Sequence, residues 1–327
     1  MIITRAPTRI TFGGGGTDIK SYYEHEPGFL IAAGIDKYTW ILANRGYYDH
    51  IHLKYSSEER VTKVDDIKHG IFREALKSFK WTDPIELVSM ADYPVGCGLG
   101  TSGSFTVALV KAIAEYIKNP TWQAYNIADH ACYIEIDLLK EPIGKQDQFA
   151  SAYGGLNCYK FEQDGQVVVT PLNVPNVAEL EKNLMLFDTR IPRSSAEILT
   201  DQVKEMEANG AVIRKLDKTK QVAYAMKDML TLGNIHDFGV RLNDYWNMRK
   251  KFSDKITNPK IDEAYDIALR NGALGGKLQG AGGGGFLLFY CPERHEKLIK
   301  ALEGVGLKHM PFKFDYKGVS SYVTNGM

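Results

Sequence analysis

The sequence predicts an α+β protein, and three observations support that prediction. The first part of the chain is rich in β-branched and aromatic residues, helix-length apolar stretches follow it, and strand-like and helix-like stretches then succeed one another in irregular order. A parallel α/β sheet would require regular alternation of strand and helix. The length of 327 residues allows two domains. Two prolines in PLNVPNVAEL (171–180) indicate a boundary there, so we expect one domain over 1–175 and a second over 176–327.

The expected N-terminal elements begin with strands. Residues 1–12 and 37–55 alternate partially between apolar and polar side chains, which predicts strands joined by short turns. Helical apolar spacing over 65–79 predicts a helix, IELVSM (85–90) predicts a strand, and the apolar run over 104–118 predicts a long buried helix. The segment between the last two is therefore a strand-to-helix turn.

The middle of the chain predicts two more helices and two strands. Residues 124–139 have helical spacing and end before a proline, and GKQDQFASAYGG (144–155) is typical of a short helix closed by glycines. LNCYKFE (156–162) and QVVVTPLNV (166–174) have the composition of strands.

The expected C-terminal elements complete the mixed order. NLMLFDT (183–189) predicts a strand, and four helical stretches follow between about 194 and 271. LGGKLQGAGGGGFLLFY (274–290) predicts a glycine-rich turn that leads into a strand. A helix over 292–306 and a terminal pair of strands end the chain.

Charge and cysteine content exclude several classes of function. Forty basic and forty acidic residues leave no net charge to attract nucleic acid or an anionic membrane, so we expect neither as a partner. The chain lacks a signal-peptide pattern and any apolar run of membrane-spanning length, which predicts a cytoplasmic protein. The four cysteines form no C-x-x-C pair, which counts against a zinc ribbon.

Glycine is concentrated in FGGGGTD (12–18), GCGLGTSG (96–103) and GAGGGG (280–285). Such runs weaken a fold, so each needs a reason, and close approach of a ligand to bare backbone amides is one. The second run precedes a helix and offers an anion site at the positive end of the helix dipole. A helix-capping turn with Thr101 or Ser102 near the N-cap is the alternative, and both remain open. A Walker A loop is excluded, since the lysine that it requires is missing.

Four segments together resemble the GHMP kinases, the superfamily of galactokinase, homoserine kinase and mevalonate kinase. They are RAPTRITFGGGGTD (5–18), PVGCGLGTSGS (94–104), PIGKQDQFASAYGG (142–155) and KLQGAGGGGF (277–286). Within the superfamily, GGGGTD, GTSGS and RSSAEIL (193–199) resemble the branch that acts on D-glycero-D-manno-heptose 7-phosphate. The resemblance implies a two-domain fold with an N-terminal domain like domain 2 of ribosomal protein S5 and a ferredoxin-like C-terminal domain. It also implies ATP and Mg²⁺ as cofactors and an active site between the domains.

The resemblance assigns roles to residues of the first two glycine segments and the helices after them. The ATP phosphate loop would consist of Gly96, Gly98, Leu99, Gly100, Thr101, Ser102, Gly103 and Ser104. Ser102 and Glu135 would bind Mg²⁺, and Asp147, twelve positions after Glu135, would accept the proton of the acceptor hydroxyl. Arg9 would lie near Asp147 and keep that carboxylate ionised. The alternatives are an exposed helical charge for Glu135 and a helix-start carboxylate for Asp147.

The expected sugar site includes Gly15, Gly16, Thr17 and Asp18, with Asp18 accepting hydrogen bonds from sugar hydroxyls or capping the next helix. Galactokinases carry glutamate and histidine at the positions of Gly15 and Gly16, so this chain has room for a larger acceptor. We also expect a group that binds the substrate phosphate, and the resemblance implies a loop that closes against the site. These are Arg193 and Ser194, for which a solvated helix start is an equal alternative, and Gly280, Gly282, Gly283 and Gly284. Lys250 and Lys251 are expected to be solvated.

The resemblance thus implies an ATP-dependent phosphotransferase that phosphorylates the anomeric hydroxyl of D-glycero-D-manno-heptose 7-phosphate to give the 1,7-bisphosphate. A kinase for a free sugar, similar to fucokinase or galactokinase, is one alternative. A non-catalytic sugar or nucleotide sensor on the same fold is another, which the joint presence of Arg9, Ser102, Glu135 and Asp147 disfavours. The partners expected are a small sugar phosphate and ATP, and a homodimer remains open.

Overall fold

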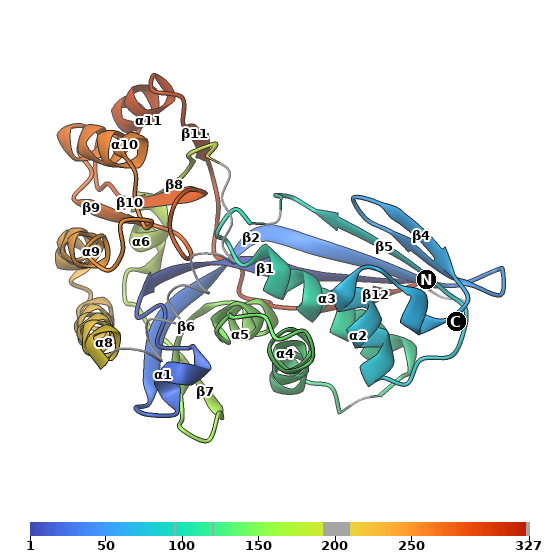
Figure 1. Ribbon diagram of the computed structural model, residues 1–327. Helices are drawn as coiled ribbons and strands as arrows, with labels where there is room; N and C mark the ends of the chain where they lie inside the picture. Colours follow the sequence, from blue (N-terminus) through green and yellow to red (C-terminus); the bar gives the residue numbers. More distant parts are fainter. Residues whose placement is uncertain (95, 120, 192–209, 325–327) are drawn as a thin grey trace.

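The computed structural model describes residues 1–94, 96–119, 121–191 and 210–324 (Figure 1). Its larger sheet has eight strands in the order β12-β1-β2-β5-β3-β4, with β6 paired to β2 and β7 paired to β6. Only the pair of β3 and β5 is parallel. The strands are β1 (Ile2–Gly13), β2 (Gly28–Arg45), β3 (Ile51–Lys54), β4 (Glu58–Val61), β5 (Ile85–Ala91), β6 (Leu156–Phe161), β7 (Val167–Pro171) and β12 (Ser320–Val323).

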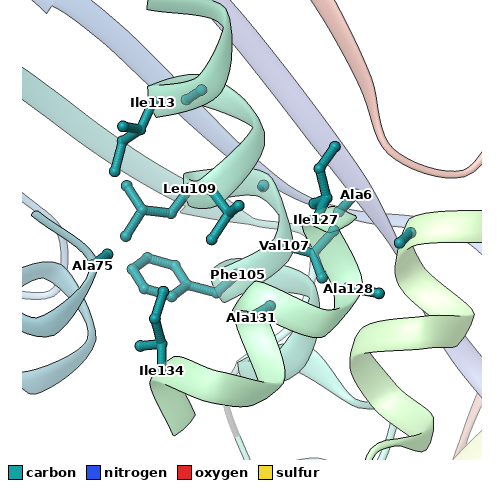
Figure 2. Packing of buried hydrophobic residues seen from close by; sticks show 14 of the residues in the cluster. Ala6, Ala75, Phe105, Val107, Leu109, Ile113, Ile127, Ala128, Ala131 and Ile134 are labelled. Carbon is teal, nitrogen blue, oxygen red and sulfur yellow. The ribbon is translucent and has the colours of Figure 1, made fainter. Parts of the chain in front are cut away.

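Helices cover one face of this sheet, and the central one is α3 (Figure 1). Because α3 is apolar on all sides, it is buried between the sheet and its neighbouring helices. Phe105 and Leu109 of α3 belong to the same core cluster as Ala75, Ala131 and Ile134 (Figure 2). The helices of this layer are α1 (Lys20–Tyr23), α2 (Gly70–Ser78) after a short turn η1 (Val64–Asp66), α3 (Thr101–Tyr116), α4 (Ala124–Cys132) and α5 (Gln146–Tyr153).

The smaller sheet is antiparallel, with the order β11-β8-β10-β9. Alternate side chains of its strands face opposite sides: Leu186 and Leu288 join the core around β1 and β2, whereas Phe187 and Phe289 join a separate core with helices. The remaining elements are α6 (Val177–Asn183), β8 (Leu184–Asp188), α8 (Gly210–Thr231), α9 (Ile235–Arg249), α10 (Pro259–Arg270), β9 (Gly275–Leu278), β10 (Phe286–Tyr290), α11 (His295–Glu303) and β11 (Lys308–Met310).

Helices α8 and α9 join the two sheets into one packed body. Met226 of α8 and Phe238 of α9 are fully buried in the cluster that includes Phe12 and Ile31 of the larger sheet. The rings of Phe12 and Phe238 meet edge to face with centroids 5.4 Å apart. This shared core holds β1 in a fixed position relative to α9, and these two elements form opposite walls of the site described below.

The α+β prediction is confirmed, but three local predictions are corrected. The expected helix over 124–139 is α-helical only to Cys132 and continues as a π-helix, η2 (Tyr133–Leu138). The terminal strands do not pair with each other, because β11 pairs with β8 and β12 returns to pair with β1. Strand β2 begins at Gly28, well before the expected start, since its first residues pair with β1 and β6.

Three helices, α8, α9 and α10, lie in the described part of the range where four were expected, and residues 192–209 lie outside the described residues. A domain boundary near residue 175 stays a prediction, with the qualification that β12 belongs to the first sheet. Within the described ranges, no helix has both the length and the apolarity needed to cross a bilayer.

Candidate active site

A cleft of about 290 Å³ lies where β1, α3 and α5 face α9 and β9. It brings together residues that are far apart in the chain, from the first glycine segment to the last. The predicted residues that line it are Arg9, Gly15, Gly16, Asp18, Gly96, Gly98, Gly100, Thr101, Ser102, Gly103, Glu135, Asp147 and Gly280.

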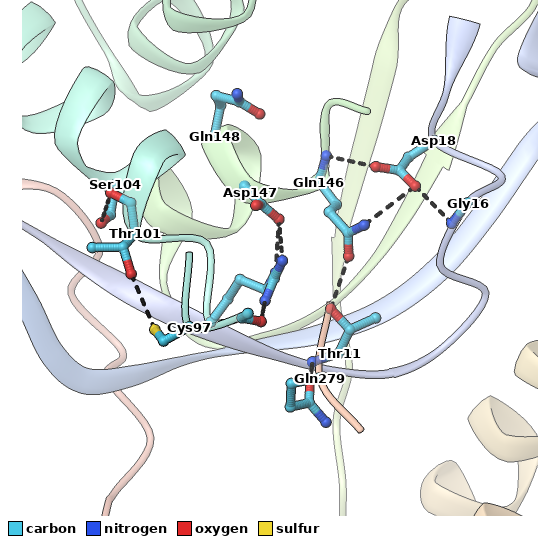
Figure 3. Close-up of polar contacts among 12 residues, drawn as sticks. Thr11, Gly16, Asp18, Cys97, Thr101, Ser104, Gln146, Asp147, Gln148 and Gln279 are labelled. Atoms are coloured by element: carbon cyan, nitrogen blue, oxygen red, sulfur yellow. Dashed lines mark hydrogen bonds and ion pairs between the residues drawn. The ribbon is translucent and has the colours of Figure 1, made fainter. Parts of the chain in front are cut away.

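The loop before α3 turns through Gly100, whose φ of 77° lies in the left-handed region that favours glycine. Gly100 itself is the N-cap, and no side chain caps the helix, so the alternative of a cap by Thr101 or Ser102 is wrong. The amides of the first turn therefore lack a side-chain cap, and with the helix dipole they could bind an anion. Figure 3 shows Thr101 beside Cys97 at this turn.

Two residues assigned to the phosphate loop, Leu99 and Ser104, have fully buried side chains and do not line the cleft. Leu99 is fully buried in the core, and its carbonyl accepts a hydrogen bond from the amide of Arg9 at 2.9 Å. Ser104 is also fully buried, and its Oγ lies 2.8 Å from Oγ1 of Thr39. Their side chains thus anchor the loop to the larger sheet and do not line the cleft.

Arg9 and Asp147 form the central ion pair of the cleft. Nε and Nη2 of Arg9 lie 2.7 and 2.6 Å from Oδ1 of Asp147, and Nη1 donates to the carbonyl of Gly98 at 2.6 Å. Arg9 is 3% exposed, so solvent screens the pair weakly. The predicted proximity of these two residues is confirmed.

Close packing of α3 on α5 aims Asp147 at the loop. A Cβ added at Gly103 would lie 2.7 Å from Cβ of Asp147 and 3.1 Å from its carbonyl carbon, so only glycine allows this approach. A Cβ at Gly100 would lie 3.2 Å from Oδ2 of Asp147. Oδ2, the oxygen that Arg9 does not contact, is therefore beside the loop that precedes α3.

Glu135 is a buried carboxylate with neutral partners. It lies on the π-helix η2 and is 1% exposed, so the alternative of an exposed helical charge is wrong. Ser102 Oγ donates to Oε1 and Gln148 Nε2 donates to Oε2, both at 2.6 Å. Burial raises the pKa of Glu135 to about 7, an increase that the nearby Asp147 charge adds to and the two hydrogen bonds oppose.

Asp18 is 1% exposed and is held by backbone amides. Its Oδ1 accepts from Gly16 N at 3.0 Å, and its Oδ2 accepts from Gln146 N at 3.2 Å (Figure 3). The N-cap of α1 is Ile19 without a side-chain bond, so the capping alternative for Asp18 is wrong. Burial, followed by the Asp147 charge, raises the pKa of Asp18.

Two other residues of the first glycine segment, Thr17 and Gly15, have different roles: the first supports the loop and the second borders the cleft. Thr17 is fully buried, with its hydroxyl 2.8 Å from the Gly14 carbonyl and accepting from the Phe29 amide at 3.0 Å, so it supports the loop from behind. A Cβ at Gly15 would meet only Nε2 of Gln146, at 4.0 Å. The space expected at Gly15 is therefore present.

Sequence reasoning missed two glutamine side chains and one lysine side chain that connect the walls of the cleft. Gln146 accepts from Oγ1 of Thr11 at 2.8 Å and donates to Asp18 at 3.3 Å. Gln279 accepts from the Thr11 amide at 2.8 Å, and Lys277 donates to the Thr11 carbonyl at 2.9 Å. All three lie inside the quoted GKQDQF and KLQGAGGGGF segments, so their position beside glycines was the available signal.

The C-terminal glycine segment reaches the cleft only at its start. Gly280 lines the cleft, whereas a Cβ at Gly282 would lie 2.8 Å from Cα of Ile256 and a Cβ at Gly284 would lie 2.5 Å from the Ile191 carbonyl. Gly283 N also donates to the Ile256 carbonyl at 2.9 Å. These three glycines therefore fasten the loop to its own half of the protein.

The remaining predicted residues lie elsewhere. Arg193 and Ser194 lie outside the described residues. Lys251 is exposed, as expected, whereas Lys250 is partly buried, contacts Asp262 of α10 at 3.3 Å and does not line the cleft.

The arrangement has the groups that phosphoryl transfer requires. Backbone amides at a helix start can bind phosphate oxygens, a carboxylate beside them can accept a proton, and a hydroxyl bonded to a buried carboxylate supplies the hard oxygen ligands that Mg²⁺ prefers. Among the described residues, no group of three or more His, Cys, Asp and Glu side chains is placed to hold a metal alone. A cation here would need phosphate oxygens or water as further ligands.

Comparisons with known proteins agree with this chemistry. The model for the GHMP kinases N terminal domain matches residues 67–155, and the model for the GHMP kinases C terminal domain matches residues 225–306. D-glycero-alpha-D-manno-heptose 7-phosphate kinase of Campylobacter jejuni is 32% identical over 98% of both chains. The L-fucokinase/L-fucose-1-P guanylyltransferase of Bacteroides fragilis is 29% identical over 68% of this chain, which corresponds to 23% of that longer protein.

Solved structures give the same result. A D-glycero-D-manno-heptose 1-phosphate kinase from Bacteroides thetaiotaomicron superposes with a TM-score of 0.82 and 26% identity, with 100% of each chain covered. A putative sugar kinase from Campylobacter jejuni superposes with a TM-score of 0.76 and 30% identity, with 98% of each chain covered.

Proposed function

The chain belongs to the GHMP kinase family, and on this premise we propose that it transfers the γ-phosphoryl group of ATP to the anomeric hydroxyl of D-glycero-D-manno-heptose 7-phosphate. The product would be the 1,7-bisphosphate. The observation that carries this proposal is the ion pair of Arg9 and Asp147 at the edge of the loop before α3. Because the reaction consumes ATP, we also propose that it takes place in the cytoplasm.

Asp147 is the proposed proton acceptor. Both Arg9 contacts go to Oδ1, so Oδ2 beside Gly100 is the oxygen available to the acceptor hydroxyl. As the hydroxyl oxygen bonds to the γ-phosphorus, the bond from that phosphorus to the bridging oxygen breaks, ADP leaves, and the hydroxyl proton passes to Asp147. Arg9 holds the carboxylate in place, and its hydrogen bond to the Gly98 carbonyl fixes the loop beside it.

The amides of the loop are the proposed phosphate donors. Gly98, Gly100, Thr101, Ser102 and Gly103 line the cleft at the start of α3, where the helix dipole favours negative charge. Fixed amides stabilise charge that grows on the transferred group without having to reorient, so they lower the barrier more than water would. Positioning and charge stabilisation together would supply most of the rate.

Ser102 and Glu135 fit a divalent cation. Glu135 is a buried carboxylate that accepts hydrogen bonds from the neutral Ser102 and Gln148. A cation would stabilise its ionised form, which burial disfavours by raising the pKa to about 7. Hydroxyl and carboxylate oxygens suit Mg²⁺, which also takes phosphate oxygens and water as ligands. Bound there, Mg²⁺ would supply positive charge to the phosphates of ATP.

Asp18 is the proposed contact for sugar hydroxyls, and the space at Gly15 accommodates a long acceptor. The likeness to a heptose 7-phosphate kinase over 98% of both chains favours this acceptor over a free sugar. A free-sugar kinase is the second candidate, because the fucokinase relative matches 68% of this chain at 29% identity.

The decisive experiment measures ADP release with Mg·ATP and each of five acceptors: D-glycero-D-manno-heptose 7-phosphate, free heptose, galactose, fucose and mannose. We expect turnover with the 7-phosphate at a kcat/KM at least 100-fold above that for any free sugar. Faster turnover of a free sugar would replace the proposed substrate and retain the kinase. Phosphate on O1 is identified by the loss of reducing-end reactivity in the product.

Asp147→Asn separates a kinase from a sensor. A kinase should lose about 10²- to 10⁴-fold in kcat while its affinity for ATP changes little, because the variant lacks only the proton acceptor. Asp228→Asn is a suitable control, since Asp228 is exposed on α8. Absence of turnover by the unchanged protein, with ATP and sugar still bound, would favour the sensor.

A further inference from the structure

We infer that Arg249, together with Lys277, which also lines the cleft, forms the subsite that binds the phosphate group of the acceptor sugar, and this inference rests on the function proposed above. Arg249 is the last residue of α9 and lines the cleft on the wall opposite α3. Neither of the two residues was singled out by sequence reasoning, although Arg249 directly precedes the Lys250 and Lys251 pair.

Arg249 is a buried cation with unused hydrogen-bonding capacity. It is 8% exposed, and its Nη1 is fully buried without a hydrogen-bond partner in the described part of the chain. The guanidinium lies over the ring of Phe252, with Cζ 4.8 Å from the ring centroid, so its orientation is fixed by packing. A buried donor without an acceptor is costly, and a phosphate, whose oxygens match the guanidinium fork, removes that cost.

Lys277 adds a second positive charge to the same wall. It is 6% exposed, and its Nζ lies 6.0 Å from the centroid of the Tyr245 ring while it donates to the Thr11 carbonyl. Tyr245 lies one turn before Arg249 on α9 and also lines the cleft. Two buried cations facing one cleft favour a ligand with more than one negative charge, as a phosphate monoester has near neutral pH.

The position of Arg249 fits the far end of a long acceptor. Along the cleft, Asp147 is joined to Asp18 through the neighbouring Gln146. The Tyr245 hydroxyl lies against the backbone of Gly14 and Gly15, next to Asp18, and Arg249 follows one turn later on α9. A heptose whose anomeric hydroxyl reaches Asp147 and whose ring hydroxyls reach Asp18 extends its seventh carbon away from Asp147, toward this wall.

The ATP phosphates have a separate binding surface at the start of α3, with its own amides, hydroxyls and the buried carboxylate Glu135. That surface belongs to the opposite wall of the cleft. Arg249 is therefore assigned to the acceptor and acts as a specificity-determining residue, selecting a sugar phosphate over the free sugar.

The test is calorimetric titration, without ATP, of heptose 7-phosphate and of unphosphorylated heptose into the unchanged protein and three variants. The variants are Arg249→Gln, Arg249→Lys, which keeps the charge but loses the fork, and Arg241→Gln as the control. Arg241 lies on the same helix, is 39% exposed and pairs with Asp244, so its loss should leave sugar binding unchanged. Thermal unfolding midpoints show whether each variant is folded.

We expect the unchanged protein to bind the 7-phosphate at least tenfold more tightly than heptose, and Arg249→Gln to weaken 7-phosphate binding about 10- to 100-fold while heptose binding changes less than threefold. Arg249→Lys should lose less, and it tests the idea if Arg249→Gln does not fold. Equal affinity of the Arg249 variants and the unchanged protein for the 7-phosphate would overturn the inference, and so would equal losses for both sugars, which indicate a structural role.

Steady-state kinetics separate the acceptor from ATP and this inference from the proposed function. In folded Arg249 variants, the KM for heptose 7-phosphate should rise about tenfold or more with the KM for ATP within twofold, and the reverse pattern would overturn the assignment. Turnover of the 7-phosphate that does not depend on Arg249 would reject the proposed subsite but would be consistent with the proposed function. Arg249-dependent binding of the 7-phosphate without turnover would support the subsite and reject the function.

Discussion

Nη2 of Arg9 lies 2.6 Å from Oδ1 of Asp147, although the two residues are 138 positions apart in the chain. Arg9 comes from β1, where it pairs with Gly34 of β2, and Asp147 comes from the first turn of α5, where the helix dipole also favours a carboxylate. The same guanidinium holds the Gly98 carbonyl, so one buried cation positions both the proposed base and the proposed phosphate loop.

Arg9→Lys should therefore reduce activity even though it preserves the charge. A lysine cannot contact Asp147 and the Gly98 carbonyl in the same fixed geometry, since its ammonium is a point charge on a flexible stem. We expect kcat to fall about 10- to 100-fold, whereas the KM for ATP should change less. Arg5→Lys is the control, because Arg5 lies on the same strand away from the cleft. An unchanged kcat in Arg9→Lys would show that the fork geometry is not used.

Gly103→Ala should displace Asp147 without removing any polar group. The added Cβ would lie 2.7 Å from Cβ of Asp147, closer than real Cβ atoms approach, so α3 and α5 must move apart. We expect a fall in kcat of about tenfold or more, with the unfolding free energy lower by about 1–3 kcal/mol. The control is Ala112→Gly, which tests how sensitive α3 is to a small substitution elsewhere in the helix. Gly306→Ala is not suitable, because Gly306 has a φ of 92° and an alanine there would itself add backbone strain. A variant with unchanged kcat and stability would contradict the close approach.

The buried Glu135 should make the ligand-free protein less stable as pH rises. Its pKa is raised from 4.5 to about 7, so the folded protein binds more protons than the unfolded chain between these values. The contribution to stability is present below pH 4.5 and is lost as pH rises through 7, by an amount on the order of 3 kcal/mol. Urea unfolding at pH 5 and pH 8 should show this loss in the unchanged protein and a smaller one in Glu135→Gln.

The control for this titration is Glu303→Gln, since Glu303 is exposed at the end of α11. Its unfolding free energy should follow the unchanged protein at both pH values. The same pH dependence in Glu135→Gln and in the unchanged protein would mean that Glu135 does not change its protonation on unfolding.

Gln279→Ala should loosen the junction between the two walls of the cleft. Gln279 accepts a hydrogen bond from the buried amide of Thr11, and the variant would leave that amide without its partner. We expect the free energy of unfolding to fall by about 1–3 kcal/mol. Urea unfolding would measure this loss, and we expect the exposed Gln166→Ala to change stability by less than about 0.5 kcal/mol. A loss in Gln279→Ala no larger than in the control would show that the Thr11 amide has another acceptor.

Much of the fold and part of the site could be predicted from local pattern. Apolar periodicity predicted the α+β order because burial of one face leaves a repeat in the sequence. The glycine runs and the acidic residues at Glu135 and Asp147 lie in short segments whose residue types serve one chemistry, so the resemblance could place them before any contact was known. The proximity of Arg9 to Asp147 came from the same resemblance.

Other features depend on contacts that no local pattern encodes. The start of α3 at a left-handed Gly100, the π-helix that carries Glu135, and the return of β12 to β1 are set by packing between segments distant in the chain. Burial at Asp18 and Glu135 raises their pKa values, and burial is a property of the assembled core. Gln279 and Arg249 differ from surface glutamines and arginines only because tertiary packing removes them from water, so that a hydrogen bond to the Thr11 amide or a charge at the cleft counts for more.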